Sequence, residues 1–159
     1  MLNETTIPFL IIGVAAFLFC LVYIRTFFIS IGGVWYEQKD ENTPTITIHL
    51  SHLGPFVWGS ALIPGGMSRY RGWFNGRTLQ LRRNDFGEAY FGGLGFPKEV
   101  FSALEGTEMA RAHFAYEPKA KKLVGEHFPQ KIDVSRTRPP RIAGRIYLPA
   151  VQREWTRVK

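Results

Sequence analysis

The residues Arg69-Tyr-Arg-Gly-Trp-Phe-Asn-Gly-Arg-Thr-Leu-Gln-Leu-Arg82 give the clearest indication of fold class in this 159-residue chain. At its centre, Asn75-Gly76 lies between two short runs of apolar and aromatic residues, which is the strongest local signal for a β-hairpin. A two-residue type I′ turn is expected because Asn and Gly both tolerate positive φ. Side chains alternate along a strand, so one face of this hairpin should be buried. The residues expected on the buried face are Tyr70, Phe74, Leu79 and Leu81.

The opposite face of the hairpin gathers three arginines around a tryptophan. A two-residue loop would place Arg69 opposite Arg82, and like charges directly opposite destabilise a strand pair. Because the planar guanidinium binds oxyanions through two parallel hydrogen bonds, this face is a candidate site for a lipid headgroup, a nucleotide phosphate or the carboxylates of a partner protein. The alternative is an ordinary solvated strand face. The candidate residues are Arg69, Arg71, Trp73 and Arg82.

Further β signals flank this hairpin. Thr45–Ser51 alternates strictly between apolar and polar residues, and short apolar runs separated by Gly and Pro follow it. A second hairpin is expected from residues 107–116 and 122–128. One short helix is expected, opened by Pro97 and stopped by Gly106. These features predict a mainly β fold with one short helix, arranged as a small antiparallel sandwich or barrel.

An apolar segment precedes the β-rich part. Ile7–Ile24 holds 18 residues without a charge, which meets the length needed for a transmembrane helix. A cleaved signal peptide is the main alternative, but residues 1–6 lack Lys and Arg and no small-residue cleavage site is evident. Arg25 and Lys39 follow the span, so the positive-inside rule predicts an N-terminus outside and a cytoplasmic C-terminal domain.

The predicted span carries a stripe of small residues. Gly13, Ala16 and Cys20 lie on one helical face, where they would allow close approach of a partner helix, although small residues also occur in lipid-facing helices. Cys20 is the only cysteine, which excludes an intrachain disulfide. No ionisable residue lies within the span, and this argues against transport by the chain alone.

The composition divides the chain into an anchor at 1–31, a polar linker at 32–44, a β-rich domain at 45–130 and a basic, Pro-containing segment at 131–159. The last segment carries eight Lys and Arg against two acidic residues. Near an anionic leaflet each such residue contributes roughly 1 kcal/mol to membrane binding, whereas the alternative is a solvated tail. The arginines expected to act there are Arg136, Arg138, Arg141 and Arg145.

The sequence contains no pattern typical of a catalytic or metal site. It lacks the glycine-rich phosphate-binding motifs and the nucleophile elbow. His49 and His52 have a spacing that sends them to opposite faces of a strand, which does not suit a shared metal. The net charge is +7, but no nucleic-acid-binding motif accompanies it. We therefore expect no enzyme activity, no cofactor, no metal and no nucleic-acid partner.

Two functions remain. The sequence favours a non-catalytic, single-pass membrane subunit or adaptor that docks a basic, β-rich domain onto a membrane protein complex. The alternative is a membrane-tethered sensor or binding module for a small, nucleotide-like anionic ligand or for anionic lipid headgroups. Both functions place the arginine face and the basic segment against acidic groups, so the sequence alone leaves the choice open.

Overall fold

One long helix, a set of strands and three short helices make up the computed structural model, which describes residues 6–37, 45–135 and 137–158. Helix α1 (Thr6–Phe28) is followed by strands β1 (Gly33–Glu37), β2 (Ile46–Leu53), β3 (Phe56–Ile63), β4 (Gly66–Phe74) and β5 (Thr78–Phe86). Three short helices come next: α2 (Glu88–Gly93), η1 (Lys98–Val100) and α3 (Phe101–Leu104). The last strands are β6 (Glu108–Glu117), β7 (Lys122–Val134), β8 (Ile142–Tyr147) and β9 (Val151–Arg157).

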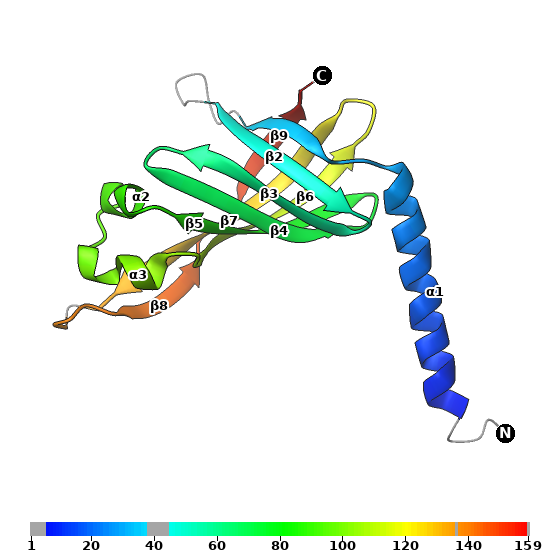
Figure 1. Cartoon of the computed structure of the whole chain (residues 1–159), viewed down its shortest axis with the longest axis horizontal. Coiled ribbons are helices and arrows are strands. Elements are labelled where there is room, and N and C mark those ends of the chain that lie inside the picture. Colours follow the sequence, from blue (N-terminus) through cyan, green and yellow to red (C-terminus); the bar gives the residue numbers. More distant parts are fainter. Residues whose placement is uncertain (1–5, 38–44, 136, 159) are drawn as a thin grey trace.

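Eight strands close into an antiparallel barrel (Figure 1). Strands β1 to β7 each pair with the next along the chain, and β9 closes the ring by pairing with both β7 and β1. Strand β8 pairs with the outer end of β7 and is not part of the ring. Closure removes free sheet edges, which are the usual sites of unwanted strand pairing. The predicted mainly β fold is confirmed. Of the two architectures expected from the sequence, a sandwich and a barrel, the chain adopts the barrel.

The Asn75-Gly76 hairpin forms, but its turn is wider than the predicted type I′ turn. Phe74 pairs with Leu79 instead of Arg77, and of the turn residues only Gly76 has positive φ. The Asn75 side chain explains the difference, because its Oδ1 accepts hydrogen bonds from the backbone N–H groups of the two residues that follow Gly76. The register shifts by two residues, which keeps each side chain on its predicted face.

The other predicted elements form with small changes. The second predicted hairpin forms from β6 and β7, with Tyr116 paired with Leu123. The helix expected after Pro97 is confirmed as η1 and α3, whose Leu104 is fully buried. Helix α2 was not predicted, because two of its six residues are glycines, which have a low helix propensity.

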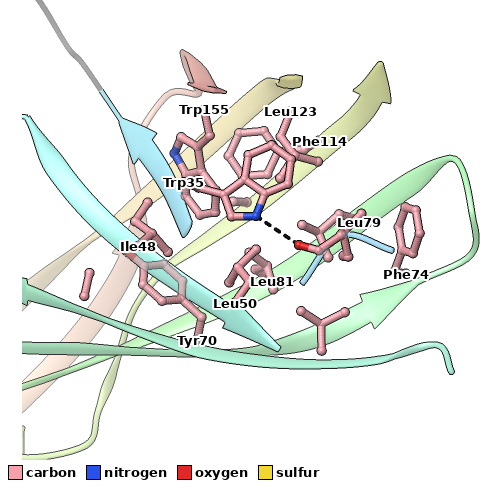
Figure 2. Close-up of a cluster of buried hydrophobic side chains, with 14 residues drawn as sticks. Trp35, Ile48, Leu50, Tyr70, Phe74, Leu79, Leu81, Phe114, Leu123 and Trp155 are labelled. Carbon is pink, nitrogen blue, oxygen red and sulfur yellow. Dashed lines mark hydrogen bonds between the residues drawn. The ribbon is translucent and has the colours of Figure 1, made fainter. Parts of the chain in front are cut away.

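Large side chains fill the barrel. Trp35, Trp155 and Phe114 lie close together in its core (Figure 2). The ring centroids of Phe114 and Trp155 are 4.6 Å apart. The Trp35 indole N–H donates a hydrogen bond of 2.9 Å to the carbonyl of Ile31, which links this core to the segment after α1. An eight-stranded barrel can be just wide enough for its own side chains to fill it, and the large buried side chains fill this one.

The end of α1 is joined directly to the barrel. Ile31 is fully buried in the barrel core. On the last strand, Arg157 donates hydrogen bonds to the carbonyls of Ser30 and Gly32. These contacts tie the segment between α1 and β1 to the strand that closes the barrel.

Two boundaries predicted from composition need correction. The segment 32–44 was predicted to be a linker, but it begins with β1, because Trp35 supplies a large side chain to the core; residues 38–44 lie outside the described residues. The segment 131–159 contains β8 and β9, and β9 completes the barrel. Trp155 on β9 is a core residue that is only 2% exposed, so this part of the basic segment packs into the barrel.

A buried ionic cluster lies at the barrel end beside α2. Asp85 is fully buried, and its carboxylate accepts hydrogen bonds from Ser68 Oγ at 2.7 Å and from Arg83 Nη2 at 3.0 Å. Burial would lower the pKa of Arg83, but the adjacent Asp85 outweighs it and raises that pKa. Burial and Asp85 together raise the pKa of Tyr90 to about 12, so its hydroxyl stays protonated. The charges of this cluster neutralise one another, which indicates a structural role.

Candidate functional site

The arginine face predicted from the sequence lies on the outer surface of β4 and β5. Arg69, Arg71 and Arg82 are exposed, and Trp73 is half-buried. All four side chains share one face because the shift in register spans two residues and not one. The residue directly opposite Arg82 is therefore Arg71, and not Arg69 as the sequence predicted.

Strand β6 adds a fourth arginine to this face. Arg111 is exposed and lies directly opposite Arg82. Arg71, Arg82 and Arg111 thus form a row across three adjacent strands, which we call the arginine row. Sequence reasoning missed Arg111 because the pairing of β5 with β6 joins strands separated by three short helices. The available signal was the alternation in β6, which faces Arg111 outward with His113.

The arginine row borders a shallow depression of about 370 Å³. Guanidinium, amide and imidazole groups surround it, together with one indole ring, and most of these can donate hydrogen bonds. Its volume falls at the small end of ligand pockets, which span roughly 300–1,000 Å³. The lining side chains include Arg71, Trp73, Gln80, Arg82, Arg111 and His113. Such a surface suits a carboxylate or phosphate group.

Glu108 partly neutralises the arginine row. Its Oε1 accepts hydrogen bonds from Arg111 Nε at 2.7 Å and from the Tyr147 hydroxyl at 2.5 Å, and its Oε2 lies 3.8 Å from Arg82 Nε. Burial would raise the pKa of Glu108, but Tyr147 and Arg111 outweigh it and lower that pKa, which keeps the carboxylate ionised at neutral pH. Arg71 makes no ion pair with any residue in the described ranges. The row therefore keeps an excess of positive charge.

The other predicted basic residues lie apart from the row. The Arg69 guanidinium lies 4.7 Å from the centroid of the Phe86 ring, and Arg69 does not line the depression. Arg138, Arg141 and Arg145 are exposed on the β7–β8 connection and on β8, and they do not line it either. Arg136 lies outside the described residues. The structure thus brings Arg71 and Arg82 together, whereas Arg138, Arg141 and Arg145 of the basic segment do not join them.

The histidines do not gather into one site. His49 and His52 lie on opposite faces of β2, as their spacing predicted, and His52 Nδ1 lies 3.1 Å from the Gly54 carbonyl oxygen. His113 faces outward, whereas His127 pairs with the inward-facing Ala112. Within the described ranges, no three His, Cys, Asp or Glu side chains are grouped to hold a metal ion.

No family model, curated protein or solved structure matches this chain. The features that indicate a function are the surface chemistry of the barrel and its position beside α1.

Helix α1 is long and apolar enough to span a membrane over Ile7–Phe28. The predicted packing residues Gly13, Ala16 and Cys20 are exposed on it. A Cβ built at Gly13 would meet no atom within 4 Å, so a second helix could approach closely there. Their role in helix packing stays a prediction.

The C-terminal half of α1 touches the barrel beside the arginine face. The ring centroids of Phe19 and Trp73 are 6.1 Å apart. Tyr23 covers Gly54 in the β2–β3 turn, where the φ of +56° and the closeness of the Tyr23 ring both favour glycine. These contacts place one end of the predicted binding face next to the apolar helix.

Proposed function

We propose that this chain is a single-pass membrane protein whose barrel serves as a non-catalytic adaptor. The burial of Ile31 and the hydrogen bonds from Arg157 to Ser30 and Gly32 support retention of α1, because a cut just after the helix would fall within a segment that the barrel holds.

The positive-inside rule orients the barrel toward the cytoplasm. A cysteine replacing exposed Lys119 should therefore stay unreactive toward an impermeant thiol reagent in intact cells, and rapid labelling would contradict this orientation.

The observation that carries the proposal is the arginine row. Three guanidiniums lie in cross-strand register, and the nearby carboxylate of Glu108 contacts only two of them. An acidic partner surface would relieve the repulsion between neighbouring arginines. It would also form charge-assisted hydrogen bonds with Arg71, each worth about 1.5–3 kcal/mol. A membrane protein complex with carboxylates near the bilayer fits this surface.

Neutralising the row tests the proposal. The variant Arg71→Gln/Arg82→Gln/Arg111→Gln, purified from its native membrane in mild detergent, is expected to recover at least about tenfold less of the partner proteins that accompany wild type. The matched control Lys98→Gln/Lys119→Gln/Lys121→Gln removes the same charge at exposed positions outside the row, and it should keep those partners. Mass spectrometry of the co-purified proteins gives the comparison. Equal recovery with the row variant and with wild type would contradict the proposal.

The depression beside the row supports a second candidate function, the binding of a small anionic ligand. Gln80 and His113 add hydrogen-bonding groups to the guanidiniums around a space of about 370 Å³. This second function is favoured if the wild-type protein, purified from the membrane in mild detergent, brings no partner proteins with it. In that case, the full-length protein in detergent should bind inorganic pyrophosphate in calorimetry, and the row variant should not. Absence of binding by wild type would exclude this candidate for phosphate groups.

A further inference from the structure

A strip of exposed apolar side chains runs along β3 beside the arginine row. Phe56, Trp58 and Leu62 face outward from β3 and are 52%, 47% and 82% exposed, and Leu53 at the end of β2 is 62% exposed. Trp73 joins them, because its ring packs edge-on against Phe56 at 5.3 Å. We call these five residues the apolar strip. It extends about 20 Å along β3, and exposed apolar side chains grouped in this way are candidates for an interaction surface.

The apolar strip begins where the barrel touches α1. Phe19, which contacts Trp73, precedes Arg25 by six helical residues, so it lies about 9 Å deeper in the apolar helix. Trp73 is therefore level with the apolar part of α1. Figure 1 shows α1 running crosswise to β4 at one end of the barrel. A bilayer crossed by α1 would thus extend along the side of the barrel that carries the strip.

Arginines flank the apolar strip at the positions where lipid phosphates would lie. Arg71 is directly opposite Trp58, and Arg69 is opposite Ser60 on the same strand. At the helix end the Arg25 side chain lies against Gly76 of the β4–β5 turn, and a crevice of about 290 Å³ lies beside this contact. The crevice is lined by Leu21, Val22, Arg25, Asn75 and Arg77. Its polar groups suit a phosphate, and its apolar helix wall suits the start of an acyl chain.

We propose that the apolar strip docks the barrel sideways on the anionic leaflet that α1 crosses. Phe56, Trp58 and Trp73 enter the interfacial region, where aromatic rings are favoured, and Arg69 together with Arg25 and Arg77 of the crevice binds lipid phosphates. This inference rests on the membrane anchoring proposed above and adds which face of the barrel meets the lipid. The arginine row begins with Arg71 at the edge of the strip and leads round the barrel to β6, so the row faces a partner beside the lipid-bound surface.

Quenching of tryptophan fluorescence tests this docking. The full-length protein is reconstituted in vesicles of phosphatidylcholine and phosphatidylglycerol that carry bromine atoms on their acyl chains. Because the strip holds two of the four tryptophans, about half of the emission should be quenched at interfacial depth. The variant Trp58→Phe/Trp73→Phe should lose this quenched component. The matched control Trp35→Phe, which alters a ring inside the barrel, should keep it.

Three outcomes separate the claims. A chain that alkaline carbonate extracts from the vesicles is not anchored, which contradicts the proposed function together with this inference. An inserted chain whose emission the bromine atoms do not quench overturns the docking alone, whatever covers the strip. In vesicles of phosphatidylcholine alone the quenching should fall about twofold, and quenching of equal size there would overturn the role given to the arginines.

Discussion

Replacing Asp85 with alanine is expected to lower the free energy of unfolding by about 3–5 kcal/mol. Asp85 is fully buried and hydrogen-bonds to Ser68 and Arg83. Its loss would leave the Arg83 guanidinium, whose side chain is only 24% exposed, without a counter-charge. Chemical denaturation of the full-length protein in detergent, followed by the fluorescence of the buried Trp35 and Trp155, measures the change.

Two further variants make this result specific. Asp133→Ala removes a carboxylate from an exposed ion pair with Lys131, and should change the free energy of unfolding by less than about 1 kcal/mol. The double variant Arg83→Met/Asp85→Leu removes both buried charges together and should recover most of the loss seen with Asp85→Ala. A double variant as unstable as Asp85→Ala would show that the unpaired charge is not the cause.

Replacing Trp155 with alanine is expected to lower the free energy of unfolding by about 3–5 kcal/mol. The Trp155 ring packs against Phe114 at 4.6 Å and against Tyr70 at 5.6 Å between centroids. It lies on β9, which pairs with β1 on one side and with β7 on the other. The substitution therefore leaves a cavity and weakens the strand that closes the barrel. Chemical denaturation followed by circular dichroism measures the change without depending on the tryptophan that is lost.

The matched control is Trp155→Phe. Phenylalanine keeps an aromatic ring at this position, and the Trp155 indole N–H has no hydrogen-bond acceptor among the described residues. Loss of that N–H should not change the free energy of unfolding. We therefore expect Trp155→Phe to lower this free energy by less than about 1.5 kcal/mol. If the alanine variant were as stable as the phenylalanine variant, Trp155 would not hold β9 in the closed barrel.

Strand faces could be predicted from the sequence because alternation is a local property. Tyr70 and Leu81 face inward and Arg71 and Arg82 face outward, as their spacing indicates. Strand register could not be predicted with equal success. The hydrogen bonds from Asn75 Oδ1 select a wider turn than the Asn-Gly signal suggests, and this changes which arginines lie opposite one another.

Closure of the barrel could not be predicted from local sequence patterns. Strand β1 follows directly on an apolar span and β9 lies in a basic segment, so neither has the composition of a domain core. They are joined by long-range pairing that buries Trp35 and Trp155 together. The same kind of pairing places Arg111 beside Arg82. The arginines of β4 and β5 in the candidate site were therefore predicted from the sequence. The arginine that β6 contributes could be identified only from the three-dimensional structure.

Photo-crosslinking from the arginine face in living cells tests the adaptor function most directly. A photoreactive amino acid is placed at Gln80, which is exposed beside the row and lines the depression, and as a control at Thr156 on β9, across the barrel from it. The adaptor function predicts a discrete adduct with a membrane protein from position 80 and none from position 156. It also predicts loss of that adduct when Arg71, Arg82 and Arg111 are changed to glutamine. No protein adduct from position 80, or equal adducts from both positions, would contradict it.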